Sequence, residues 1–230
     1  MFICSMRYVK LGEMMVDAGT YNPQEATGLD GDNPLRVSKS SFMLVNSCPR
    51  RYWWQKIGLA GLDIPASQPM IRGKLIHSAY EHLFNEWRGE TDFTSILEIM
   101  ARCKQPDEGF LIMEEPDFGL AIGALAELEE QRIEAWGADT FAPILFEDKL
   151  TYDCPILGVR LVGVPDAVLL RPNGDLVIVE LKTGSWNDGK MGRTRRELAF
   201  YWHILKNSGY DTEDRGDIYF MYVAPDCDNY

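Results

Sequence analysis

The chain has 230 residues, of which 46% are hydrophobic, and a formal net charge of -12. This length suits one large domain, or one domain with a helical annex. No segment approaches the roughly 20 apolar residues that cross a bilayer, and the apolar start is too short for a secretory signal. We therefore expect a soluble, cytoplasmic protein without a membrane partner. The net charge disfavours a polyanionic partner at long range but does not decide local binding.

The five cysteines are widely spaced and include no Cys-x-x-Cys pair. An odd number at such spacing indicates neither a disulfide framework nor a zinc site. We expect free thiols in a reducing compartment. The five are Cys4, Cys48, Cys103, Cys154 and Cys227.

The chain is predicted to begin with an N-terminal extension, residues 1–35. Residues 17–34 within it are dense in Gly, Asn, Asp and Pro, which is typical of a loop. The segment SKSSFMLVNSCPRRYWWQKI follows. Its serines are suitable helix caps, and Pro49 is acceptable in a first helical turn, so we expect two short helices there.

Three longer helices are predicted next. PMIRGKLIHSAYEHLFNEW carries apolar residues at helical spacing. Similar patterns predict helices at 92–103 and 117–136. Residues 36–140 should therefore form a helical region.

From about Pro143 the apolar pattern changes from helical to extended. Three strands joined by turns should be followed by a helix, TRRELAFYWHILKNSG, and a last strand, GDIYFMYVAP. The three strands are ILFEDKLTYD, GVRLVGVPDAVLL and DLVIVELKT.

This order of elements predicts an α/β fold with a mixed sheet flanked by helices. Residues 141–230 should form its core, and residues 36–230 one compact domain.

The run VIVELKTG places two charged residues in an apolar strand. Residues two apart in a strand point to the same face, so Glu180 and Lys182 should project together. Asp166 precedes Glu180 by one hairpin turn, and neighbouring strands lie about 4.8 Å apart, so the two carboxylates could meet. Such a pair repels unless a divalent cation lies between them, and oxygen ligands favour Mg²⁺ or Mn²⁺. The alternative is an exposed ion-pair network of little energetic weight.

Two basic segments could bind nucleic acid. Arg50 and Arg51 precede three aromatic residues, as in single-strand binding surfaces. Arg193, Arg195 and Arg196 follow the Glu-x-Lys strand, where a helix start offers free N–H groups to anions. The alternatives are buried aromatic residues in a short helix for the first segment and an ordinary helix N-terminus for the second.

Taken together, these segments resemble the PD-(D/E)XK nucleases, and among them the RecB-like branch with its AddB-type and CRISPR-associated exonucleases. The resemblance runs from about Ser38 to about Ala224, with the motifs in the order of the family. The matching segments are SSFMLVNSCPRRYWW, RGKLIHSAYEHLF, GVPDAV, VELKTG and ELAFY.

The resemblance implies a restriction-endonuclease-like core and a nuclease site. His77, Asp166, Glu180 and the backbone carbonyl of Leu181 would hold Mg²⁺ or Mn²⁺, and Lys182 would position or help deprotonate the attacking water. The implied activity is that of a metal-dependent deoxyribonuclease, an exonuclease acting on DNA ends or single strands.

The alternatives to this activity are a catalytically altered DNA-binding or assembly subunit, a structure-specific endonuclease and an RNA-directed enzyme. Recombination or CRISPR-type protein partners and a homo-oligomer are implied only by the resemblance.

One departure from the family pattern lies in the last motif. Glu197 stands where the family usually has glutamine, one helical turn before Tyr201. Both positions belong to the implied catalytic set. An ionised glutamate cannot donate the hydrogen bonds of a glutamine. Glu197 could bind a second metal, pair with Arg193 or indicate an altered activity, and we favour a salt bridge to a nearby arginine.

The second departure concerns iron. Some RecB-like relatives hold a 4Fe-4S cluster through one cysteine of the Cys-Pro-Arg segment and three near the C-terminus. Here Cys48 takes the first place, but only Cys227 lies near the end. Since four thiolates are needed, we expect no cluster unless the native chain continues with further cysteines.

Overall fold

The computed structural model describes residues 35–53, 67–103, 116–183, 188–210 and 218–223. The predicted loop at 17–34 and the cysteines Cys4 and Cys227 lie outside these ranges. No disulfide joins the cysteines that are described, Cys48, Cys103 and Cys154. None of the described helices combines the length and apolarity needed to cross a membrane.

The described chain begins with a short strand that the sequence did not predict. Strand β1 (Leu35–Ser38) pairs in parallel with β4. It leads into two short helices, α1 (Lys39–Ser47) and α2 (Pro49–Trp53). Both helices were predicted, and the Ser38 hydroxyl caps α1 by accepting the Ser41 N–H at 3.2 Å.

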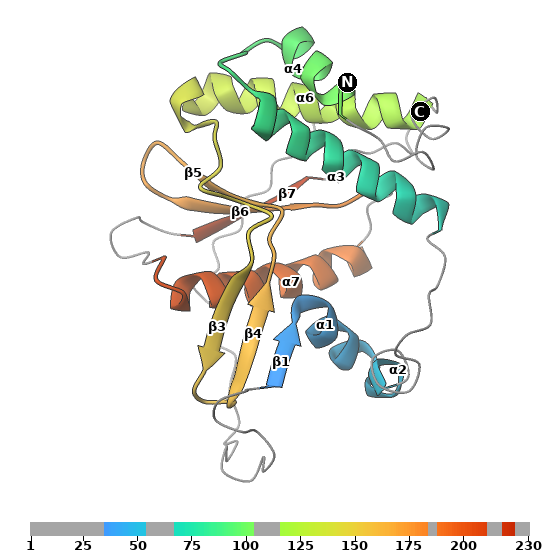
Figure 1. Cartoon of the computed structure of the whole chain (residues 1–230), viewed down its shortest axis with the longest axis vertical. Coiled ribbons are helices and arrows are strands. Elements are labelled where there is room, and N and C mark those ends of the chain that lie inside the picture. Colours follow the sequence, from blue (N-terminus) through green and yellow to red (C-terminus); the bar gives the residue numbers. More distant parts are fainter. Residues whose placement is uncertain (1–34, 54–66, 104–115, 184–187, 211–217, 224–230) are drawn as a thin grey trace.

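Three longer helices lie at the places where the sequence predicts them. They are α3 (Gln68–Glu86), α4 (Phe93–Ala101) and α6 (Pro116–Trp136), followed by a 3₁₀ turn at Ala138–Thr140. The Asp92 side chain caps α4 by accepting the Ser95 N–H at 3.0 Å. These helices form one layer on the same side of the central sheet (Figure 1).

The mixed pairing predicted for the strands is confirmed, but the strands form two small sheets. One has the order β1-β4-β3 and the other β2-β5-β6-β7, and each contains a parallel and an antiparallel pair. The bounds are β2 (Leu145–Phe146), β3 (Leu150–Cys154), β4 (Val159–Gly163), β5 (Ala167–Leu170), β6 (Leu176–Leu181) and β7 (Ile218–Val223).

Two of the three predicted core strands were wrong as continuous strands. The first breaks after β2, where Glu147 has a φ of 46° that a strand cannot accommodate. The second breaks between β4 and β5, where Pro165 has no N–H for a ladder hydrogen bond. Both breaks lie where the two sheets diverge, and the second leaves Asp166 just outside β5.

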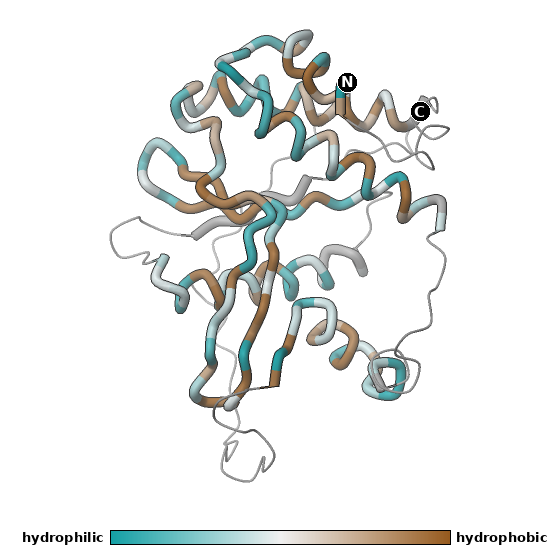
Figure 2. The backbone as a smooth tube through the Cα atoms, viewed as in Figure 1, coloured by the Kyte–Doolittle hydropathy of each residue, from teal (hydrophilic) through white to brown (hydrophobic). Residues whose placement is uncertain are grey.

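Strand β6 is buried on both faces. Val177, Val179 and Leu181 pack against the layer of α3, α4 and α6. Leu176 and Ile178 pack against helix α7 (Asp188–Asn207) on the opposite side (Figure 1). Because both faces are covered, residues 176–179 of the strand form a continuous apolar run rather than an alternating one, and this part of the sheet is mainly brown in Figure 2.

Helix α7 begins before the predicted Thr194 and is followed by Gly209, whose φ of 85° suits a helix C-terminus. The predicted α/β fold is thus confirmed, with helices on both faces of the sheet that contains β6.

A buried polar network ties α3 to α6. The Tyr80 hydroxyl donates to Glu129 Oε1 at 2.7 Å, and Arg132 Nε donates to Glu129 Oε2 at 2.7 Å. Arg132 also donates to the carbonyls of Thr140 at 3.3 Å and Phe141 at 3.1 Å. Both charged side chains are fully buried, so their hydrogen bonds must replace water.

Candidate active site

Asp166 lies at the junction of the two sheets, at the open end of the β5–β6 hairpin. Ala167 pairs with Val179, so the next position along places Asp166 opposite Glu180, as predicted. Asp166 Oδ2 accepts the Leu181 N–H at 2.6 Å, and the Asp166 carbonyl accepts the Glu147 N–H at 3.2 Å. The carboxylate is therefore fixed from β6, with Oδ1 left for another partner.

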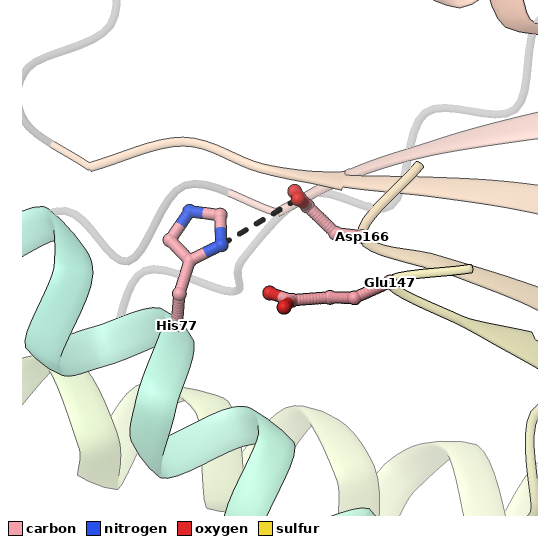
Figure 3. A group of neighbouring side chains, drawn as sticks. All are labelled: His77, Glu147 and Asp166. Atoms are coloured by element: carbon pink, nitrogen blue, oxygen red, sulfur yellow. Dashed lines mark ion pairs between the residues drawn. The ribbon is translucent and has the colours of Figure 1, made fainter. Parts of the chain in front are cut away.

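His77 reaches this junction from α3. Its Nδ1 lies 3.5 Å from Asp166 Oδ1 (Figure 3). Gly73, one turn earlier, allows the close approach of α3, because a Cβ there would come within 3.2 Å of the Thr183 hydroxyl oxygen. Burial lowers the pKa of His77, although Glu180 and a backbone hydrogen bond with Leu181 act to raise it. The imidazole is therefore neutral at pH 7, as a metal ligand must be.

Glu147 is a third member of the site, and the sequence analysis missed it. One ligand atom each of His77, Glu147 and Asp166 lies within 4.8 Å of the other two (Figure 3). The left-handed turn at Glu147 directs its side chain to this point. Burial raises the pKa of Glu147, and the nearby charge of Glu81 raises it further. This set of one nitrogen and two carboxylates suits a divalent cation.

Glu180 and Lys182 point to the same side, as the strand period predicted. Glu180 Oε1 accepts hydrogen bonds from Lys182 and from Lys39 Nζ, the latter at 2.8 Å. Lys39 belongs to α1 and was not predicted as a site residue. Although burial acts to lower the pKa of Lys39, the charges of Glu180, Glu197 and Asp166 raise it overall.

The favoured pairing of Glu197 with an arginine was wrong. Glu197 Oε2 instead lies 2.7 Å from Lys182 Nζ and 3.6 Å from Lys39 Nζ. The reason is the packing of α7 on the sheet, which turns Glu197 inward to 7% exposure, whereas Arg193 stays exposed.

The second oxygen of Glu180 has no hydrogen-bond partner among the described residues. Glu180 Oε2 is buried, and an unsatisfied buried acceptor of this kind costs about 1–3 kcal/mol. Burial and the charge of Glu180 raise the pKa of Asp166 to about 7. A buried, unpaired carboxylate oxygen beside a second carboxylate of raised pKa is suited to binding a cation.

Tyr201 braces the turn that carries Asp166. Its hydroxyl donates to the Val164 carbonyl at 2.7 Å, and its ring fills the space beside Gly163, where a Cβ would come within 2.8 Å of a ring carbon. Burial raises the pKa of Tyr201, so the hydroxyl keeps its proton. The catalytic role that the sequence suggested for Tyr201 stays a prediction.

Replacing Tyr201 by phenylalanine should separate these roles. The ring packing would remain, but the Val164 carbonyl would lose its donor, so we expect about 1 kcal/mol lower stability. Turnover at the site should fall by less than about tenfold, because the loosened turn carries Asp166. Urea unfolding and turnover rates measure the two effects. A loss of turnover comparable with that of an Asp166 variant would instead assign the hydroxyl a direct catalytic role.

The predicted basic residues all lie on the surface. Arg50 and Arg51 are exposed on α2, and Arg193, Arg195 and Arg196 are exposed on the first half of α7. Helix α1 contacts both α2 and α7, so the two groups lie on elements that share α1 as a neighbour. Cys48, at which the sequence predicts no iron-sulfur cluster, is exposed between α1 and α2, and its sulfur accepts the Arg51 N–H at 3.4 Å.

A pocket of about 510 Å³ opens beside His77. It runs along α3 and is bounded by Glu147 and Thr183 on the sheet side. The walls combine polar and apolar groups. They consist of Pro69, Met70, Gly73, Lys74, His77, Ser78, Glu81, Glu147 and Thr183.

The site lies where the two sheets diverge and combines neighbouring carboxylates, a neutral imidazole and two lysines. This is the composition of a metal-dependent hydrolase site. The model of the PD-(D/E)XK nuclease superfamily matches residues 36–227. The chain belongs to this superfamily, and its mixed α/β architecture agrees with a restriction-endonuclease-like core. No curated protein is detectably similar in sequence.

Proposed function

We propose that this chain is a divalent-metal-dependent deoxyribonuclease of the RecB-like type, which acts as an exonuclease on DNA ends or single strands. The observation that carries the proposal is the meeting of His77 with Asp166 at 3.5 Å, beside a Glu180 carboxylate with one buried, unpaired oxygen. Superfamily membership supports the reaction class. The branch, the substrate and the exonuclease mode are parts of the proposal.

His77, Asp166, Glu180 and the Leu181 carbonyl would hold the ion, and Glu147 extends this set beyond the sequence prediction. When bound, a divalent ion polarises the scissile phosphate and lowers the pKa of a water molecule. One nitrogen among oxygen donors favours Mn²⁺ relative to an all-oxygen site, while Mg²⁺ remains suitable.

Lys182 is the residue that we assign to the attacking water. Its ammonium group is shared between Glu180 and Glu197 at the edge of the site and is partly exposed, so it can reach a substrate. From there it would orient the water and offset negative charge that develops on the phosphate.

The exposed arginines of α2 and α7 would bind the DNA backbone, because guanidinium groups form paired hydrogen bonds with phosphates. These residues are Arg50, Arg51, Arg193, Arg195 and Arg196. Backbone contacts read no bases, so cleavage should show little sequence preference.

Metal removal tests the function directly. We expect end-labelled single-stranded and duplex DNA to be shortened from an end in Mn²⁺ or Mg²⁺, to remain intact in excess EDTA, and to be cleaved again when Mn²⁺ is restored. Labels at the 5′ and 3′ ends, a circular DNA and a matched RNA distinguish exonuclease from endonuclease action and DNA from RNA. Binding of DNA without cleavage in either metal would favour the alternative of an inactive DNA-binding subunit.

A further inference from the structure

Lys39 is brought to the candidate active site from the far end of the described chain. It is the first residue of α1 and follows Ser38, which caps α1 and pairs with Val162 in the β1–β4 ladder. This anchoring places Lys39 Nζ 2.8 Å from Glu180 Oε1, although the two residues are 141 positions apart. The ammonium group also lies 5.0 Å from the centre of the Tyr201 ring.

Lys39, Lys182, Glu180 and Glu197 form a cluster in which each lysine lies close to both glutamates. Lys39 and Lys182 both donate to Glu180 Oε1, and both lie within ion-pair distance of Glu197 Oε2, at 3.6 and 2.7 Å. Glu180 is thus held through one oxygen only. The other oxygen is the buried one that has no partner within the described part of the chain.

Among the side chains joined at the site, the charge becomes balanced only with Lys39. Four carboxylates, two lysines and a neutral imidazole carry a net charge of -2, which one divalent ion neutralises. Lys74 and Glu81, which line the adjoining pocket, offset each other. Without Lys39 the loaded site would keep a charge of -1 and would repel a phosphodiester. The positive charge of Lys39 acts to lower the pKa of His77 and the pKa of Asp166. The carboxylates are those of Glu147, Asp166, Glu180 and Glu197.

We propose that Lys39 and Glu197 are a compensating pair of positioning residues, which hold Glu180 and Lys182 in place and set the net charge of the metal site. The inference rests on the proposed function for its catalytic consequence. Its electrostatic part concerns metal binding alone and can be measured without DNA.

The test is Mn²⁺ binding to the full chain, followed through the electron paramagnetic resonance signal of free Mn²⁺. Lys39→Met removes a positive charge, so the Mn²⁺ dissociation constant should fall about tenfold. Glu197→Gln removes a negative charge, so it should rise about tenfold. The double variant restores the net charge and should return to within about threefold of wild type.

Cleavage rates supply the second readout. Lys39→Met should reduce kcat about a hundredfold although it binds the metal more tightly, because the loaded site then repels the phosphate. Adding Glu197→Gln should recover at least about tenfold of that loss. A residue with a merely structural role would produce no such recovery.

Two controls separate charge from packing. Lys39→Arg keeps the charge and should keep the wild-type Mn²⁺ affinity. Lys206→Met removes an exposed lysine in the last turn of α7 and should change neither readout. Thermal unfolding verifies each fold, and Lys39→Gln replaces Lys39→Met if the latter does not fold.

The inference is overturned if Lys39→Met weakens or does not change Mn²⁺ binding, or if the double variant keeps both the Mn²⁺ affinity and the cleavage rate of Lys39→Met. If the wild type binds Mn²⁺ and the variants shift it as expected but no DNA is cleaved, the proposed function fails while the electrostatic pairing stands.

Discussion

Replacing Asp166 by asparagine is expected to reduce metal-dependent cleavage by at least about a thousandfold while the protein stays folded. Asp166 is the residue that joins the two sides of the site, because Oδ1 faces His77 and Oδ2 accepts the Leu181 N–H. An asparagine amide can still accept that N–H, so the local fold should survive. It cannot supply the negative charge that a divalent ion needs.

The measurement is single-turnover cleavage of an end-labelled oligonucleotide over a range of Mn²⁺ concentrations. Because the pKa of Asp166 is raised to about 7, metal binding to the wild type should release protons near neutral pH, and the variant should release fewer. Asp153→Asn is the matched control, since Asp153 is an exposed partner of Arg160 on β3. Retained turnover in Asp166→Asn would remove the metal site from this junction.

Local patterns in the sequence predicted most of the helices because each signal lies within the element itself. The apolar spacing of α3 and the serine before α1 are examples. The division into two sheets was not predictable in the same way. Gly163 and Pro165 indicate a bend in the strand, but only the packing of Tyr201 against Gly163 and its hydrogen bond to Val164 show that the chain passes there from one sheet to the other.

The candidate site was predictable where a strand or hairpin fixed the geometry. Glu180 and Lys182 are two apart in one strand, and Asp166 and Glu180 are opposite each other across one hairpin, so regular geometry brought them together. The roles of these residues and of His77 remain predictions until variants are measured.

Lys39 and Glu147 could not be identified from sequence alone. Lys39 begins an ordinary capped helix, and its approach to Glu180 depends on the parallel pairing of β1 with β4 over a long separation. Glu147 stands beside Asp148 in an acidic turn, and nothing in the sequence distinguishes the two. Its place at the site follows from the left-handed turn after β2 and from the bond between the Glu147 N–H and the Asp166 carbonyl.

Replacing Arg132 by methionine is expected to destabilise the fold by about 3–5 kcal/mol, because it leaves the fully buried Glu129 carboxylate without its cation. The Tyr80 hydroxyl would be the remaining donor in the network that joins α3 to α6. Arg132 also packs over the rings of Trp136 and Phe141, with its guanidinium 5.6 and 4.8 Å from their centres, but methionine fills much of that space. Urea unfolding followed by circular dichroism measures the loss.

A second substitution shows whether an uncompensated charge causes this loss, because the two explanations predict opposite changes in the free energy of unfolding. Glu129→Gln removes the carboxylate charge, so the double variant Arg132→Met/Glu129→Gln should be more stable than Arg132→Met alone. If packing were the main contribution, the second substitution would instead add to the damage. Arg160→Met breaks an exposed arginine–aspartate pair of similar geometry and should leave the unfolding midpoint unchanged. If Arg160→Met destabilised the protein as much as Arg132→Met, the explanation by a buried charge would be contradicted. Water can solvate the exposed Asp153 carboxylate after its partner is removed, whereas it cannot reach the buried Glu129 carboxylate.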